Sequence, residues 1–523
     1  MQLGWFDIAV LVGYFGLTMG MGFFFARKNT NTEEYFLGGR SFPGWALGLS
    51  LLGTSISSVT FIAFPADTFK TTWIRFLPHI VFPVAALIAA WFILPFFRRG
   101  TISSAYEYLG KRFGDSVSCY AAATFLVIQL VRISTIVYLV SVLLQSITGL
   151  SIFWCILLTG GITALYTTTG GFDAVIWTDV LQTITLIFGS VLILAIIVHA
   201  LPDGFGQIVS DGIEHQKFSF SQWSQEKGFH PMPRGISLSQ KTLFMMLLVG
   251  FVGFLTGQFD QTTVQRWCSA KSAKEARKSI YFLAAISVPV WASFMLVGTA
   301  IWVYFHNFPD VVPQEMLEGT RKAEEIVPYF VLNYLPPGIV GIVIAAAMAA
   351  AMSSLSSSIN AIGMVWVQDI YKKFIVKNRS DRHYLKIGFV SSAAVSVLMM
   401  LGAWWLYKAQ TKTLMDFGMI LGSLTMSGLA GIFLVGMLTR LADARAIWAG
   451  VVCNMFFAGY ALLSDRALLP EALCVPFDLY YTAIVGNTIT ILVTLFMARF
   501  VWRTRRTDFA NLTVWDQERT PLV

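Results

Sequence analysis

Apolar runs close to the roughly 20 residues that a helix needs to cross a bilayer recur along the whole chain. Polar stretches separate them at intervals that predict thirteen membrane-spanning helices. The fourth and ninth runs are long enough to be tilted or to extend beyond the bilayer. The expected spans are 5–26, 42–66, 73–97, 117–147, 151–168, 174–200, 241–264, 279–305, 327–370, 385–407, 413–438, 444–463 and 477–500.

The composition supports an all-α integral membrane protein. Hydrophobic residues make up 56% of the 523 residues, charged residues only 13%, and the mean hydropathy is +0.67. A soluble domain does not have this balance. The five cysteines show no CxxC spacing, and the chain contains neither an HExxH motif nor a GxxxxGK[ST] loop. These patterns argue against a disulfide framework, a zinc enzyme and an ATP-driven pump.

Basic residues predict the topology, because cytoplasmic loops collect Lys and Arg. Alternate connections hold 25 of the 37 Lys and Arg residues, which places these connections in the cytoplasm. An odd number of spans then puts the N-terminus outside and the C-terminus inside. The net charge of +8 follows from this topology and gives no reason to expect nucleic acid as a partner. The basic connections are 27–40, 98–112, 266–278, 372–386, 440–445 and the tail from Arg499.

A serine cluster within the ninth span is the first candidate site. The segment 349–358 (AAAMSSLSSS) places Ala350, Ser353, Ser354 and Ser357 on one helical face at i, i+3, i+4 and i+7. Hydroxyls and freed carbonyls are hard oxygen ligands, so this face could bind a small cation such as sodium. Alternatively, the small residues allow close helix packing, and each serine bonds to a carbonyl of its own helix.

Two spans carry segments that favour a break in the helix. The segment 53–60 (GTSISSVT) is rich in small and β-branched residues, and its unwinding would free the carbonyls of Gly53 and Ile56. The segment 257–261 (GQFDQ) lies five spans later. Interruptions in corresponding positions indicate inverted repeats with a binding site near the midplane. A Ser/Thr-rich packing face in the first segment, and a helix cap formed by Asp260 and Gln261, are the alternatives.

Two charged residues lie within apolar spans, where a charge is costly and needs a partner. Arg132 could bind an anionic solute, or it could have a structural partner or reach toward the membrane surface. Asp179 follows the glycine pair Gly170 and Gly171 and is a candidate functional carboxylate.

These segments together resemble the sodium/solute symporter family. The resemblance includes 33–40 (EEYFLGGR), 104–112 (SAYEYLGKR), the pattern around Gly171, Asp179 and Gln182, the segment 261–266 and the serine cluster. It implies one transmembrane transporter domain over 1–523 with a LeuT-type core of two inverted five-helix repeats. Repeat one would cover about 42–200 and repeat two about 241–438, with one preceding helix (5–26) and two following helices (444–463 and 477–500).

The resemblance also implies two sodium sites. The main site would be formed by the carbonyls of Gly53, Ile56 and Ala350 and by the hydroxyls of Ser353 and Ser354. Within the family, the chain resembles bacterial sodium/sialic acid symporters, in which a second sodium binds an Asp and serines. The matching residues here are Asp179, Ser356 and Ser357, together with Ser353, which both sites would share.

Substrate recognition is expected among residues of the broken spans and their neighbours. The resemblance implies that Ser57, Thr60 and Arg132 hold a carboxylate. A glutamine of the family aligns with His79, and this departure leaves the identity of the solute open. The third-span glutamate and eighth-span lysine of galactose-type relatives have no counterpart here. The complete set of candidate substrate-binding residues is Ser55, Ser57, Thr60, His79, Arg132, Asp260 and Gln261.

We therefore expect a multi-pass symporter of the bacterial inner membrane or a plasma membrane, without enzymatic activity, that uses sodium to import a small anionic sugar acid such as sialic acid. A neutral sugar, a nucleoside or a monocarboxylate is the alternative solute. A sodium-conducting channel and a transporter-like sensor are alternative classes, and the short C-terminal tail disfavours a fused signalling domain. The lipid bilayer is the expected environment, and a monomer the expected state.

Overall fold

The computed structural model describes residues 3–56, 58–98, 102–224, 228–409, 428–465, 468–502 and 509–516. Within these ranges, nine helical segments are long and apolar enough to cross a membrane, and two further helix pairs qualify if each bent pair is one span. The nine segments are α1 (Trp5–Ala26), Trp73–Arg98, α9 (Asp115–Thr148), α10 (Ile152–Ala200), α14 (Ala273–Asn307), Ile339–Ile375, α18 (Asp381–Ala409), α20 (Ala444–Asp465) and Thr482–Val501.

Several of these segments are composite. Prolines at 78, 83 and 95 accompany the short elements of Trp73–Arg98, although the segment still passes as one span. These elements are η2 (Trp73–Phe76), α5 (Leu77–Ile80), α6 (Phe82–Ile88), η3 (Ala89–Ile93) and α7 (Leu94–Arg98). The other composite segments are α17 (Ile339–Val365) with η5 (Trp366–Ile375), and α21 (Thr482–Phe496) with η8 (Met497–Val501).

Helix α10 contains a reversal at Gly171. This residue has φ 61° and ψ −155°, a conformation open to glycine and strained for other residues. The Gln182 amide donates to the Tyr166 hydroxyl at 3.2 Å, although residues 16 positions apart in one straight helix would lie about 24 Å from each other. The chain therefore turns back at Gly171, in agreement with separate expected spans at 151–168 and 174–200.

Both predicted helix breaks are present. Helices α3 (Gly44–Ser55) and α4 (Ser58–Lys70) meet at a bend of 59°, and α12 (Leu243–Gly257) and α13 (Gln261–Ser269) meet at a bend of 54°. Asp260 begins α13 as its N-cap, since its carboxylate accepts the Thr262 N–H at 2.8 Å.

The ninth expected span, 327–370, is not one continuous helix, contrary to the sequence-based expectation. Helix α16 (Ile326–Tyr334) ends before Pro336 and Pro337, and α17 begins only at Ile339. Two consecutive prolines lack the N–H groups that a continuing helix needs. Of the expected span 413–438, the structure describes residues 428–438, which form a short apolar helix.

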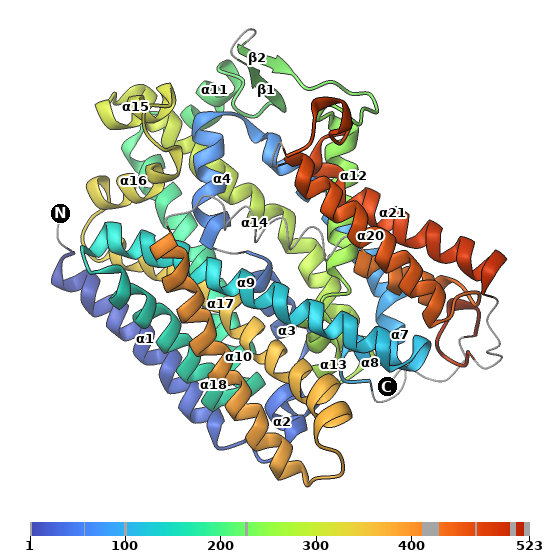
Figure 1. Cartoon of the computed structure of the whole chain (residues 1–523). Coiled ribbons are helices and arrows are strands. Elements are labelled where there is room, and N and C mark those ends of the chain that lie inside the picture. Colours follow the sequence, from blue (N-terminus) through green and yellow to red (C-terminus); the bar gives the residue numbers. More distant parts are fainter. Residues whose placement is uncertain are drawn as a thin grey trace.

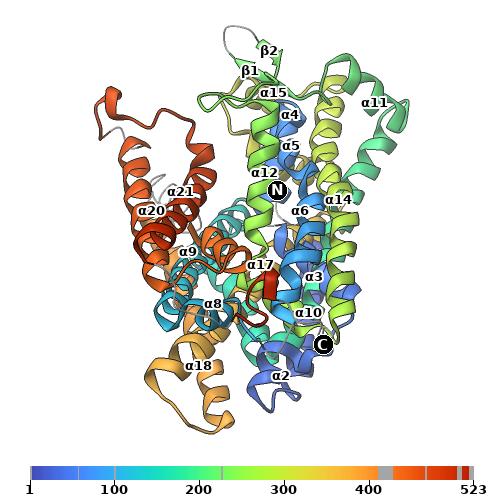
Figure 2. The same ribbon diagram turned by 90° about the vertical axis from the view of Figure 1, so that its right-hand side faces the viewer.

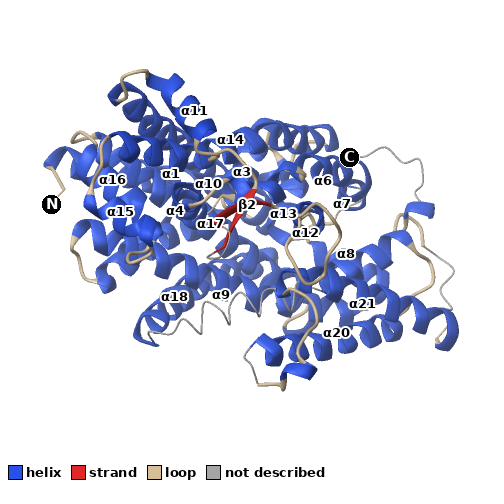
Figure 3. Cartoon of the chain, turned by 90° about the horizontal axis from the view of Figure 1, so that it is seen from above, coloured by secondary structure: helices blue, strands red, loops and turns tan. Residues whose placement is uncertain are grey.

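The connections collect at opposite ends of the helix bundle (Figures 1 and 2). Helices α11 (Gly204–Glu214) and α15 (Val311–Glu318) lie at one end together with the hairpin of β1 (Ser221–Ser224) and β2 (Gly228–Pro231). Helix α2 (Thr32–Leu37) lies at the other end. In Figure 3 the hairpin lies above the middle of the bundle, and α20 and α21 form a pair at its edge.

Helix α1 is fixed to α17 by a buried carboxylate. Asp7 is 3% exposed, and its Oδ1 accepts the N–H groups of Gly338 and Gly341 at 2.7 and 2.8 Å. These N–H groups belong to the start of α17, where a helix has unpaired donors and a partial positive charge. Asp7 therefore anchors the helix that precedes the expected core to the helix that carries the serine cluster.

Some basic residues counted as loop residues in the topology argument are buried. Arg98 donates to the carbonyls of Trp267 and Cys268, and Arg112, at the end of α8 (Ala105–Phe113), donates to three carbonyls beyond residue 435. They are 5% and 2% exposed. These guanidiniums therefore join elements inside the protein and are not solvent-exposed loop charges.

Lys217, in the connection after α11, forms hydrogen bonds with the C-terminal end of α4. Its ammonium donates to the carbonyls of Thr68, Phe69 and Thr71 at 3.2, 2.8 and 3.1 Å, and it lies 4.6 Å from the Trp302 ring centroid. These carbonyls belong to the C-terminal end of a helix, where a cation is favourable. The side chain is nevertheless buried, and burial lowers the pKa of Lys217 to about 7.

This pKa predicts a pH-dependent stability. Between about pH 7 and the usual lysine pKa near 10.4, the unfolded chain holds a proton that the folded protein has released, so the free energy of unfolding rises with pH. We expect the wild type to gain stability relative to Lys217→Met between about pH 7 and 9, and the difference to be constant below pH 7. Thermal unfolding of both proteins in detergent, repeated across this pH range, measures this difference in stability. A difference that stays constant up to pH 9 would show that the folded protein retains the proton on Lys217.

Candidate cation and solute site

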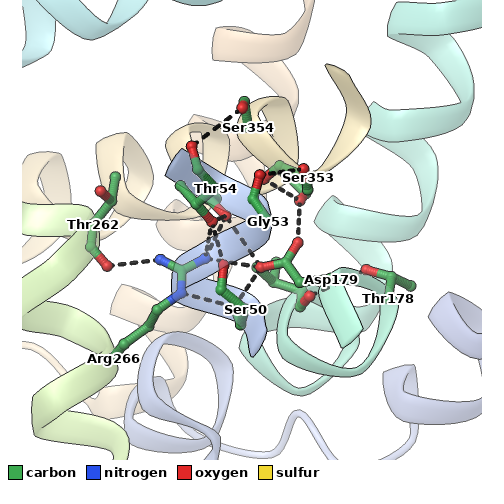
Figure 4. Close-up of polar contacts among 12 residues, drawn as sticks. Ser50, Gly53, Thr54, Thr178, Asp179, Thr262, Arg266, Ser353 and Ser354 are labelled. Carbon is green, nitrogen blue, oxygen red and sulfur yellow. Dashed lines mark hydrogen bonds and ion pairs between the residues drawn. The ribbon is translucent and has the colours of Figure 1, made fainter. Parts of the chain in front are cut away.

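The serine face of α17 packs against the broken end of α3. The Ser353 hydroxyl donates to the Gly53 carbonyl at 3.0 Å, and the Ser354 hydroxyl donates to the Thr54 carbonyl at 3.4 Å. Both hydroxyls also lie near the Ala350 carbonyl, at 3.3 and 3.5 Å. Figure 4 shows these serines opposite the end of α3. The two serines are at most 1% exposed, so the contact is fully inside the protein.

Gly53 allows this close approach. A Cβ at this position would lie 2.2 Å from the Thr183 hydroxyl of α10, so any larger residue would push α3 away. Three residues later, Ile56 is buried and has extended backbone angles of −101° and 110°, which end the helical ladder. Four of the five candidate ligands of the main sodium site therefore lie in direct contact, and the fifth, Ile56, lies where the carbonyl leaves the helix. Neutral oxygens of this kind suit a monovalent cation.

Asp179 lies beside this cluster and is completely buried. Its Oδ2 accepts from the Ser50 hydroxyl at 2.5 Å, from Arg266 Nη2 at 2.8 Å and from the Ser357 hydroxyl at 3.3 Å. Its Oδ1 accepts from the Ser356 hydroxyl at 3.3 Å. The two carboxylate oxygens thus differ, because Oδ2 is crowded with donors and Oδ1 has a single long contact.

Arg266 is the cationic partner of Asp179 and is 0% exposed. Its guanidinium donates to Ser50 Oγ at 2.7 Å, to the Thr262 carbonyl at 2.7 Å and to Thr54 Oγ1 at 2.8 Å, and it also contacts Ser357 Oγ at 2.5 Å. Figure 4 shows the side chain reaching from α13 toward Asp179 across the end of α3. A buried ion pair of this kind is tolerated when hydrogen bonds satisfy its remaining groups.

The candidate substrate residues have more varied surroundings. Arg132 is half-buried on α9 and forms no hydrogen bond or ion pair with the residues that the structure describes. His79 lies among aromatic rings, with centroid distances of 5.1 Å to Phe64, 5.4 Å to Phe254 and 4.4 Å to Trp291. These rings come from α4, α12 and α14.

Three of the remaining candidate substrate residues form hydrogen bonds with other parts of the protein. Asp260 Oδ2 accepts from the Gln129 amide at 3.1 Å, and Asp260 also lines a cavity of about 30 Å³, enough for one water molecule. Gln261 is buried and accepts the Ala105 N–H at 2.7 Å. Ser55 donates to the Leu52 carbonyl at 2.7 Å. Thr60 is half-buried on α4, and Ser57 lies outside the described residues.

Comparison with known proteins identifies the family. The sequence profile of the sodium:solute symporter family matches residues 35–453. The chain is 30% identical to the sodium/sialic acid symporter NanT of Aliivibrio fischeri over 458 residues, which cover 87% of each chain. It is 29% identical to the sodium/sialic acid symporter SiaT of Proteus mirabilis, over 87% of this chain and 89% of that one. The chain belongs to the sodium:solute symporter family.

A solved structure agrees with this assignment. The substrate-bound outward-open state of a Na⁺-coupled sialic acid symporter matches with a TM-score of 0.82 and 26% identity, over 96% of this chain and 99% of that chain. The protein is thus a multi-pass, sodium-coupled symporter rather than an enzyme, and sodium and a small molecule are its ligands.

Sequence reasoning missed the role of Arg266 in this symporter. The topology prediction counts Arg266 in the basic connection 266–278. Three signals in the sequence indicate a buried position instead. Arg266 follows the predicted break by only six residues, and its own helix has polar residues at Thr262 and Gln265 that would not face lipid. An unpaired Asp179 within the membrane also required a cation.

The ion pair predicts strong coupling between Asp179 and Arg266. Asp179→Ala should lower the free energy of unfolding by about 3 to 5 kcal/mol, because a buried guanidinium loses its counter-charge. Arg266→Met alone should be similarly costly, whereas the double variant should cost clearly less than the sum of the two. Thermal unfolding of all four proteins in the same detergent gives the comparison. Additive effects would show that the two side chains are energetically independent.

Proposed function

We propose that this symporter couples inward sodium flow to the import of a small anionic sugar acid, with sialic acid as the best candidate. The observation that carries the proposal is the oxygen cluster between the broken helix α3 and α17, in which Gly53, Ala350, Ser353 and Ser354 contact one another. The named relatives transport sialic acid with sodium, and this shared architecture supports the same class of solute here.

The architecture we propose is a single domain over 1–523 with thirteen spans, the N-terminus outside and the C-terminus inside. The bends at α3/α4 and α12/α13 would mark corresponding helices of two inverted repeats, about 42–200 and 241–438. The collection of the connections 201–240 and 306–326 at one end of the bundle supports this orientation. The bacterial relatives support an inner membrane location, and a monomer is our working assumption.

The main sodium ion would bind between α3 and α17. Its ligands would be the carbonyls of Gly53, Ile56 and Ala350 and the hydroxyls of Ser353 and Ser354. The hydroxyls of Ser353 and Ser354 donate to the carbonyls of Gly53 and Thr54. Rotation of these hydroxyls would present oxygen lone pairs to sodium without movement of the backbone.

A second sodium ion would bind on the Oδ1 side of Asp179. Ser356 already contacts Oδ1, and Ser353 lies one helical turn away on the same face. Ser357 completes the set implied by the family, but its hydroxyl lies next to Arg266 and Thr54. We therefore expect Ser356 to contribute more directly than Ser357. Each sodium ion that moves down 100 mV supplies roughly 2.3 kcal/mol, so two ions would support steep accumulation.

Arg132 would bind the carboxylate of the solute. A half-buried guanidinium with no partner among the described residues can offer a bidentate fork to a carboxylate. Thr60, Ser57 and Ser55 of the first broken span would add hydroxyl contacts, and Asp260 and Gln261 would line the second break. His79 and its aromatic neighbours would face the rest of the solute, which is where this chain departs from the sialic acid pattern.

The main sodium site is tested by the double variant Ser353→Ala/Ser354→Ala. Removal of two of about five ligands should abolish sodium-driven uptake into proteoliposomes while the protein still folds and inserts. The measurement is uptake of labelled sialic acid driven by a sodium gradient. Uptake with the sodium dependence of the wild type would disprove the assignment.

Ser356→Ala is the matched control on the same helix. It should leave uptake measurable and reduce the Hill coefficient for sodium from two toward one, because only the second site loses a ligand. Loss of all uptake in this variant would mean that the two sites cannot be separated.

The anionic solute is tested at Arg132. Arg132→Lys keeps the charge but loses the planar fork, so the apparent KM for sialic acid should increase with little change in sodium dependence. Arg132→Ala should cost more, about 2 to 5 kcal/mol if the pair is desolvated. A thermal-shift screen of sialic acids, hexoses, nucleosides and monocarboxylates, in sodium and in potassium, identifies the solute. A neutral solute that binds equally to the wild type and Arg132→Ala would overturn the proposal.

A further inference from the structure

An open apolar groove runs along the outer side of α1. Its volume is about 460 Å³, and Trp177 of α10 forms its other wall. A Cβ added at Gly16 or Gly20 would meet no atom within 4 Å, so these glycines leave the groove hollow. The lining residues are Gly16, Leu17, Gly20, Met21, Phe24, Phe25 and Trp177.

The groove does not belong to the helix-packing face of α1. Gly22 is buried, and a Cβ there would lie 2.5 Å from Tyr166, so this glycine is required for contact between helices. Gly16 and Gly20 are instead exposed, as are their neighbours Leu17 and Phe24 at 52% and 68%. Because α1 is a membrane-spanning helix, this face lies toward the bilayer.

The groove leads to two cations. Gly16, Gly20 and Phe24 are spaced four residues apart, so they form a row on one helical face, and the next turn brings Arg27 and Lys28. Both basic residues are exposed directly after the end of α1. Neither forms an ion pair with another residue of the described ranges, and Lys28 lies 5.3 Å from the Phe25 ring centroid. This position corresponds to the headgroup region of the membrane.

The opposite wall also fits the membrane interface. Trp177 packs edge-on against Trp45, with ring centroids 5.8 Å apart, and Trp45 is 49% exposed. Tryptophan is enriched where the acyl region meets the headgroups. The groove is therefore bordered by a tryptophan pair on one wall and is followed along α1 by the basic pair.

We propose that this groove binds one acyl chain of an anionic phospholipid, whose headgroup phosphate is held by Arg27 and Lys28. A linear hydrocarbon chain matches an open groove without polar groups, and a negative phosphate matches two exposed cations. A second copy of the protein fits less well. Two parallel α1 helices packed at Gly16 and Gly20 would bring four like charges together at their ends.

The test is lipid binding to the purified full-length protein, measured by native mass spectrometry. Phosphatidylglycerol and phosphatidylcholine with identical acyl chains are titrated separately, so that only the headgroup differs. We expect the wild type to bind phosphatidylglycerol on the order of tenfold more tightly. Arg27→Gln/Lys28→Gln should remove this preference. Equal affinity of the wild type for the two lipids would overturn the role of the cations.

The groove itself is tested by Gly16→Leu/Gly20→Leu, which fills the space. This variant should lose the tightly bound lipid. Gly13→Leu is the matched control, because Gly13 lies on the same helix, also has open space and does not line the groove. Unfolding midpoints equal to that of the wild type show that the variants are folded. Unchanged lipid binding in the filled variant, or a wild-type dimer that this variant converts to a monomer, would overturn the proposal.

Discussion

The contact between Arg266 and Asp179 holds four helices together at the centre of the membrane protein. Asp179 lies on α10, Arg266 on α13, their partners Ser50 and Thr54 on α3, and Ser357 on α17. Two charges in a low-dielectric interior are stable only if nearly every lone pair and N–H group has a partner. The hydroxyls at the end of α3 satisfy this requirement, so the break in α3 and the ion pair support each other.

This arrangement divides the polar centre into two parts. On one side, Arg266 supplies a permanent positive charge and occupies Oδ2. On the other side, Oδ1 and the Ser356 hydroxyl, which also lies 3.2 Å from the Ser353 carbonyl, form a region in which a mobile cation would be stabilised. A fixed cation holds the carboxylate in place through a permanent ion pair, whereas a mobile one would leave during the proposed transport cycle. The same carboxylate can therefore serve the fold and the proposed transport cycle.

Much of the fold could be predicted from the sequence because membrane spans are encoded by long apolar runs. The breaks near Gly53 and Asp260, and the reversal at Gly171, follow from local backbone preferences. The interruption at Pro336 and Pro337 was missed, because apolar residues continue on both sides of it and length alone suggested a tilted helix. The short amphipathic helix α8 was missed for the opposite reason, since it lacks an apolar run.

The residues that supply oxygen ligands to the candidate site could be predicted from the sequence, but the ion pair between Asp179 and Arg266 could not. Serines on one face of a helix indicate a set of ligands, and the structure brings Ser353 and Ser354 to the end of α3. Which cation faces Asp179 depends on a contact between residues 87 positions apart in the chain, and no local pattern encodes that distance. His79 illustrates the same limit, because its aromatic neighbours come from three different segments.

The Asp7 cap gives the first helix a mechanical role. Asp7 holds the starting turn of α17 through two N–H groups, so the N-terminal ends of α1 and α17 are joined. If alternating access tilts α17 against the broken helices, the Asp7 hydrogen bonds would make α1 tilt together with α17. The unit that moves would then include a helix outside the proposed repeat that contains α17, and the surrounding lipid would have to yield along the length of α1 with each turnover.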